Sequence, residues 1–197
     1  MGCTIATGKA ILCQNDVGGI DQIALISGID AKRIKSVVVT SGIAASCNTF
    51  TDSSASSAGT WFKIDLDKYQ SNFNQTIVTS DSGVAYQQDL EIVCRGVQGS
   101  TIELFEEIVS GIWQIMVRDN NGIYYLMDFQ KMARCTGGTF IHNGDAALSD
   151  PIGFTLTFSA MGLQPAINMT ADPTAIKDTA ATPLASIILS EVQIGVA

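Results

Sequence analysis

Residues 100–128, STIELFEEIVSGIWQIMVRDNNGIYYLMD, carry the strongest structural signals of the chain. Ser100 and Glu103 have the spacing of a capping box, in which the serine accepts a hydrogen bond from the third helical N–H and the glutamate reaches back to the serine N–H. Gly111 is a favourable residue just beyond a helix end. Between them, apolar residues recur at three- and four-residue spacing: Ile102, Phe105, Ile108 and Val109. We therefore predict one short amphipathic helix over about 100–110.

The same stretch continues as a β-hairpin. Two apolar runs, 112–118 and 123–128, flank Asn121 and Gly122, which favour the positive φ angles of a two-residue primed turn. Such a turn predicts two cross-strand pairs, Val117 with Leu126 and Arg118 with Tyr125. The helix and hairpin contain no nucleophile–base pair and no cluster of metal ligands, so they indicate architecture rather than catalysis.

Outside this stretch the chain has mainly strand patterns. Residues 153–160 alternate apolar and hydroxyl side chains without error, which is typical of a strand with one face in the core. Residues 61–66 alternate as well, with Trp61, Lys63 and Asp65 on one side of the strand. Further strands are predicted at 9–14, 21–27, 36–40, 73–79, 85–95 and 184–194. A long exposed loop or hairpin tip is predicted at 41–59, where serine and alanine dominate, and loops are predicted around 135–145, where glycines cluster.

The composition favours one large folded domain. Hydrophobic residues make up 46% of the 197 residues and charged residues 15%, which is too apolar for a disordered chain and leaves apolar surface for partner subunits to cover. We expect a core domain over 1–165 and a C-terminal arm with a final strand over 166–197. Since neither a long apolar run nor a secretory signal is seen, we expect a soluble chain that is not exported.

The charge balance argues against tight nucleic-acid binding. The net charge is −8, and residues 32–35, Lys-Arg-Ile-Lys, form the one basic cluster, which is most simply a solvated turn or strand end. An acidic surface would suit a channel through which DNA passes without being held.

No motif predicts an enzyme, a cofactor or a metal. His142 is the one histidine, and a catalytic reading would have to pair it with Cys135 or a remote cysteine. The five cysteines have wide, irregular spacing, so we expect reduced thiols, with a single disulfide as the alternative. Asp65 and Asp67 lack the further oxygen ligands of a calcium loop. The best binding alternative is an aromatic sugar platform formed by Trp113, Tyr124 and Tyr125, against ordinary cross-strand packing of the same rings.

The order of these elements resembles the tail tube proteins, or major tail proteins, of long-tailed bacteriophages. The likeness covers about residues 8–170 and depends on five segments: GGIDQIALI at 18–26, FKIDL at 62–66, the helix at 100–110, VRDNNGIYYLM at 117–127 and SDPIGFTLTF at 149–158. Pro151-Ile152 departs from the family, which commonly has a glycine shortly before an aromatic strand at this place.

The resemblance implies a β-sandwich or barrel-like subunit, flanked by one helix, that forms hexameric rings stacked into a DNA-ejection tube. Its partners would be copies of itself and other tail proteins of the virion, with DNA passing through unbound and no membrane contact. Loop 41–60 and arm 164–197 are candidates for contacts between subunits. Candidate interface residues are Phe50, Asp52, Trp61, Tyr124, Tyr125, Ile187 and Ile188. The rivals are another virion component, such as a head–tail connector or decoration protein, and a glycan-binding β-sandwich.

Overall fold

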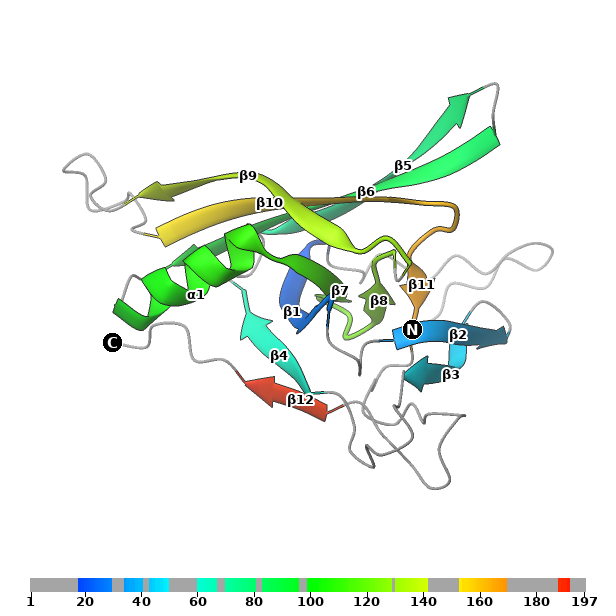
Figure 1. The fold of residues 1–197 in the computed structure, drawn as a ribbon, viewed down its shortest axis with the longest axis horizontal. Helices are drawn as coiled ribbons and strands as arrows, with labels where there is room; N and C mark the ends of the chain where they lie inside the picture. Colours follow the sequence, from blue (N-terminus) through cyan, green and yellow to red (C-terminus); the bar gives the residue numbers. More distant parts are fainter. Residues whose placement is uncertain are drawn as a thin grey trace, which may run out of the picture.

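The computed structural model describes residues 18–29, 34–40, 43–49, 60–66, 70–80, 83–95, 99–128, 130–141, 153–169 and 188–191. In these ranges the chain is mainly β, with one helix, α1 (Gly99–Ser110), which confirms the predicted class (Figure 1). The strands up to the helix are β1 (Ile20–Ser27), β2 (Ile34–Thr40), β3 (Ile43–Thr49), β4 (Thr60–Asp65), β5 (Asn72–Ser80) and β6 (Gly83–Arg95). After the helix come β7 (Ile112–Asp119), β8 (Tyr124–Leu126), β9 (Ala133–Ile141), β10 (Gly153–Gly162), β11 (Ile167–Asn168) and β12 (Ile188–Glu191).

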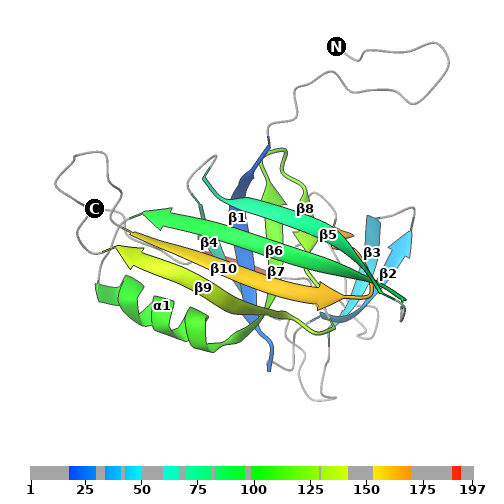
Figure 2. The same cartoon turned by 90° about the horizontal axis from the view of Figure 1, so that it is seen from above.

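The strands form a folded, open sheet with two layers. One layer has the order β9-β10-β6-β5, and it crosses a second layer built around β4, β1, β7 and β8 (Figure 2). Strand β7 is the junction, because it pairs with β1 from Trp113 to Asp119, with β8 near its end, and with β9 through only Ile112 and Trp113. The architecture is therefore sandwich-like, and the described strands do not close into a barrel.

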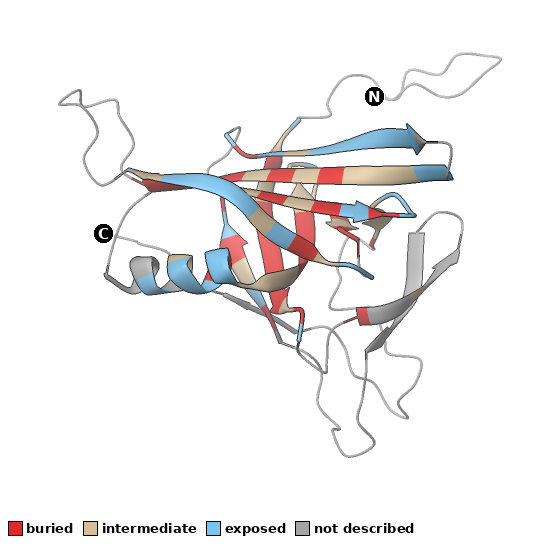
Figure 3. Cartoon of the chain, turned by 45° about the horizontal axis from the view of Figure 1, so that its top comes forward, coloured by how far each residue is buried: buried red, intermediate tan, exposed pale blue. Residues whose placement is uncertain are grey.

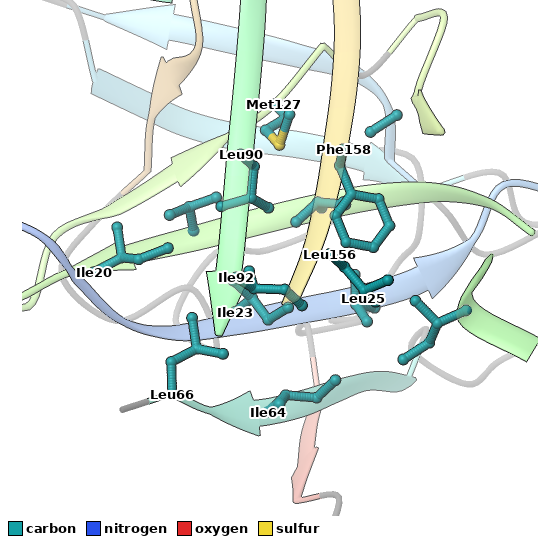
Figure 4. Close-up of a cluster of buried hydrophobic side chains, with 14 of the residues drawn as sticks. Ile20, Ile23, Leu25, Ile64, Leu66, Leu90, Ile92, Met127, Leu156 and Phe158 are labelled. Carbon is teal, nitrogen blue, oxygen red and sulfur yellow. The ribbon is translucent and has the colours of Figure 1, made fainter. Parts of the chain in front are cut away.

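The main core lies between the two layers. Leu90 of β6 and Phe158 of β10 are fully buried in one cluster with Ile23 of β1 and Ile64 of β4 (Figure 4). The side chains alternate along β10 as predicted, since Phe154, Leu156, Phe158 and Ala160 are all buried. This alternation places one face of the upper layer in the core.

The second layer is buried on its other face too. Ala24 and Ile26 of β1 belong to a second apolar cluster with Trp61 of β4 and Met116 of β7. The buried side chain of Gln114 fixes β2 to this face, because its Oε1 accepts the Ile34 N–H at 2.8 Å and its Nε2 donates to the Ile34 carbonyl at 2.7 Å. Both polar groups of Ile34 are thereby satisfied without water.

The helix was predicted correctly over about 100–110, although Ser100 lies within its first turn and not ahead of it. Ile108 is buried in the main core, while Val109, which the periodicity placed on the apolar face, is 41% exposed. The Phe105 ring packs against Phe140 of β9 and Phe154 of β10, with ring centroids 5.3 Å apart in each case. The helix thus flanks the β9 side of the sandwich.

Two segments predicted as loops are strands. Residues 43–49 form β3, which pairs antiparallel with β2, and residues 133–141 form β9, which pairs with β10. The glycines that suggested a turn have a different role: a Cβ on Gly138 would lie 2.5 Å from the Thr155 carbonyl oxygen of β10. Close approach of two strands therefore explains this glycine.

The predicted register of the β7–β8 hairpin was wrong by one residue. Val117 pairs with Tyr125, and Arg118 pairs with Tyr124. The loop has three residues rather than two, because Asp119 Oδ1 accepts the N–H groups of Asn121 and Ile123, and Gly122 alone takes the positive φ, 83°. Since faces alternate along a strand, the shift places Tyr124 on the face of Arg118 and Tyr125 on the face of Val117.

The C-terminal segment contributes strands to the sheet. β11 pairs with β8 and β3, and β12 runs parallel to β4 with Ile188 opposite Thr60. Met169, just after β11, is buried in the second cluster. No helix of the described ranges has the length and hydropathy needed to cross a membrane.

Candidate assembly surface

Strands β5 and β6 form a long hairpin, here called the β5–β6 ribbon (72–80 and 83–95), that extends beyond the rest of the fold (Figure 1). The pairing is continuous from Asn72 opposite Glu91 to Ser80 opposite Gly83, with no bulge in the register. Gly83 follows the turn with a φ of 132°, a conformation that favours glycine. The ladder between the two strands is therefore unbroken from the core to the turn.

The outer part of the ribbon is exposed on both faces. Every residue from Asn74 to Thr79 is exposed, and Figure 3 shows β5 pale blue along most of its length. Three aliphatic side chains are among the exposed ones: Ile77 at 63%, Val84 at 50% and Val78 at 39%. Apolar side chains with no core beneath them favour contact with a partner surface.

The outer edge of β5 is bare in the part of the chain that the structure describes. β5 ends the upper layer, and its outer main-chain groups pair with no strand of the described residues. None of the residues from Asn72 to Ser80 is charged or proline, although the chain carries a net charge of −8. Natural edge strands are usually protected by charge, proline, bulges or short length, and β5 has none of these.

The base of the ribbon is held firmly. Asn72 Nδ2 donates to Glu91 Oε2, and Asn74 Nδ2 donates to Asn72 Oδ1, each at 3.0 Å. Gln75 Oε1 accepts the N–H of Ala166 at 2.9 Å, which ties β5 to the segment before β11. These contacts connect the base of β5 to β6 and to the segment before β11.

A groove of about 340 Å³, here called the edge groove, lies beside the base of β5. Phe73 of β5 lines one side, and Ile20, Val117 and Tyr125 of the second layer line the other. Asp119 also lines it, with Oδ1 already engaged by two backbone N–H groups. The groove lining therefore combines apolar side chains, the amide side chains of Asn72, Asn74 and Gln75, and one carboxylate.

A second cavity, of about 420 Å³, lies between α1 and β9. Phe105, Val109 and Leu156 give it an apolar lining, and Cys135 is at its wall. The Cys135 thiol is free and lies 3.3 Å from the Gly137 carbonyl oxygen, to which it donates. Nothing else in this cavity is reactive.

The structure separates the predicted interface residues into three groups. Trp61 is fully buried and Tyr124 is 6% exposed, so neither side chain is available on the surface of the described fold. Tyr125 is half-buried and lines the edge groove, and Ile188 begins β12. Phe50, Asp52 and Ile187 lie outside the described residues, as does most of loop 41–60.

The three rings of the possible sugar platform do not share a surface. The Trp113 indole N–H donates to the Ile108 carbonyl at 2.8 Å, which holds that ring against the end of α1. The Tyr124 hydroxyl donates to Gln22 Oε1 at 2.6 Å inside the fold. Gln22 in turn donates to Asp65 Oδ1 at 2.6 Å, so Tyr124 belongs to a polar row across the second layer.

Sequence reasoning identified β5 as a strand but missed its exposure. The run 72–80 has no charged residue and no proline, and this pattern is typical of a protected central strand. The local pattern therefore did not indicate an exposed edge. Whether such a strand is covered or exposed depends on how far the opposing layer extends. The local sequence pattern does not give that distance.

The described residues contain no group of three or more His, Cys, Asp or Glu side chains placed to hold a metal ion. His142, the candidate acid–base residue, is outside them. Comparison with known proteins found no matching family model, no matching curated protein and no matching solved structure. Inference about function therefore starts from the surface geometry.

Proposed function

We propose that this chain is a structural subunit that assembles with copies of itself, and that the assembly is the tail tube of a long-tailed bacteriophage. The observation that carries self-assembly is the bare β5 edge: nine residues, unbulged and uncharged, on a ribbon that extends from the fold. Such an edge is a template for a further strand, and evolution normally blocks it. A partner strand in the assembled state accounts for its presence.

The ribbon also fits the kind of contact that a ring needs. A ring of identical subunits requires two different surfaces on each copy, so that one surface of a subunit binds the other surface of its neighbour. The β5 edge supplies an accepting surface, with exposed Ile77 beside it. Its lack of charge matters, because copies with a net charge of −8 would otherwise repel each other at the contact.

The tube is supported by the order of elements along the chain. A strand pair, the helix α1 beside the sandwich and the β7–β8 hairpin follow one another as in the tail tube resemblance. The acidic balance would keep DNA from being held during ejection. In this proposal the protein is located in the virion tail, where its partners are its own copies and other tail proteins.

Electron microscopy of the purified full chain tests the proposal. We expect rings with six-fold symmetry, or tubes made of stacked rings, at micromolar concentration. A uniformly dispersed monomer over a wide range of concentration and salt would overturn self-assembly. Closed shells or rings without stacking would keep self-assembly but replace the tube by another virion component.

A further inference from the structure

The bare edge and the edge groove are adjacent parts of one surface. Residues Asn72–Gln75 of β5 line the groove, and Ile20, Val117 and Tyr125 line it from the second layer. This is the arrangement used in strand addition, where the main chain of the edge provides hydrogen bonds and a neighbouring pocket receives a side chain of the added strand. The surface therefore fits an extended segment better than a compact ligand.

The chemistry of the surface limits what that segment can be. The groove is lined by apolar side chains, by the amide side chains of Asn72, Asn74 and Gln75, and by the Asp119 carboxylate. An acidic segment would meet like charge at Asp119. The occupant should be of strand length, with apolar or uncharged polar side chains, and neutral or basic overall.

We propose that the occupant is the segment 9–14, Lys-Ala-Ile-Leu-Cys-Gln, of a neighbouring copy of this chain. This assignment rests on the proposed self-assembly and names the contact that produces it. The segment lies outside the described residues, and its sequence has the required chemistry. Residues 1–15 contain Lys9 and no acidic side chain, whereas the whole chain has 19 acidic residues.

The position of the segment in the chain supports the assignment. Gly19 lines the edge groove, so the chain that precedes it is joined to the fold at the groove. Six extended residues span about 20 Å, which matches the exposed part of β5 from Asn74 to Thr79. Passing the segment to the next copy gives each subunit one donor and one acceptor, as a closed ring requires.

Two full-chain variants separate donor from acceptor. Ile11→Asp together with Leu12→Asp places acidic residues in the donor segment, and Ile77→Lys places a charge on the edge of β5. Ile29→Lys is the matched control, because Ile29 is 91% exposed in the turn after β1. Circular dichroism and tryptophan fluorescence would establish that every variant is folded.

Sedimentation velocity gives the decisive comparison. We expect wild type and Ile29→Lys to assemble, and each defective variant alone to remain a monomer. An equimolar mixture of the two defective variants should form a one-to-one pair that does not grow, because one variant keeps the donor segment and the other keeps the acceptor edge. Assembly of the Ile11→Asp/Leu12→Asp variant at wild-type level would overturn the segment assignment and leave the proposed function standing. A mixture that stays monomeric would also overturn it.

A monomeric wild type would overturn the proposed function. Hydrogen exchange at residues 74–79 would then show whether segment 9–14 binds the β5 edge of its own chain. Exchange that is slow in wild type and at least tenfold faster in the Ile11→Asp/Leu12→Asp variant would mean that each chain covers its own edge. Equally fast exchange in both would mean that the segment does not bind β5. Either result overturns donation to a neighbour.

Discussion

The β1–β7 pair and the β5–β6 ribbon are both long antiparallel pairs in the same sheet, yet they have opposite surroundings. β1 is buried along almost all of its length, and the middle of β7 is buried on both faces. β5 is exposed from Asn74 to Thr79, and its outer edge meets no described strand. One pair is therefore part of the core, whereas the other carries surface that the described fold leaves uncovered.

This division predicts separable effects. Substitutions in the β1–β7 region should change the free energy of unfolding, whereas substitutions on the ribbon should change association and leave that free energy nearly unchanged. The predictions below run from the largest expected effect on unfolding to the smallest.

Phe158→Ala should have the largest effect, because Phe158 is fully buried between the two layers. Loss of this ring leaves a cavity, which costs about 3–5 kcal/mol. Urea denaturation followed by tryptophan fluorescence would measure it. Phe62→Ala is the matched control, since Phe62 is 50% exposed and should cost about 1 kcal/mol or less. Equal losses for the two variants would contradict the position of the core.

Gln114→Leu should destabilise the protein by about 2–4 kcal/mol, because it leaves the N–H and carbonyl of Ile34 buried without their partner. Gln130→Leu, at an exposed position, should stay within about 0.5 kcal/mol of wild type. Chemical denaturation measures both, and hydrogen exchange should accelerate in β2 for the Gln114 variant. Unchanged exchange in β2 would show that Gln114 does not hold that strand.

Tyr124→Phe should cost about 1 kcal/mol, since it removes the hydroxyl that donates to Gln22 Oε1 and keeps the ring in place. Thermal denaturation in the same buffer would detect the loss. An unchanged melting temperature, or an assembly defect without loss of stability, would indicate that Tyr124 faces a partner instead of the core.

Ile77→Lys should change the free energy of unfolding by no more than about 0.5 kcal/mol, because the side chain is 63% exposed and leaves no cavity. Urea denaturation at a concentration where wild type is dissociated provides the measurement. A loss above about 2 kcal/mol would mean that the ribbon tip is part of the core.

The sequence was sufficient where a pattern is local. The alternation in β10 and the period of α1 each reflect a single element against a single core, and both were predicted. β9 was missed because its glycines were interpreted as turn residues. Gly138 is instead required by the close approach of β10, and the sequence pattern alone does not distinguish these two reasons for a glycine. The β7–β8 register was missed because the Asp119 side chain enlarges the turn by one residue.

The candidate surface could be only partly predicted, for a related reason. Tyr125 was named as an interface candidate and lies in the edge groove, but Trp61 was named beside it and is buried. A tryptophan in an alternating strand has the same local pattern whether its face is covered or open. Trp61 is covered by other residues of the second cluster, such as Met169, which are distant from it in sequence.

The most direct test of self-assembly through the β5 edge is sedimentation velocity of wild type, Ile77→Lys and Ile29→Lys at matched micromolar concentrations. Our account predicts large assemblies for wild type and for Ile29→Lys, and a folded monomer for Ile77→Lys. Assemblies of wild-type size formed by Ile77→Lys would contradict it, as would a wild-type chain that remains monomeric.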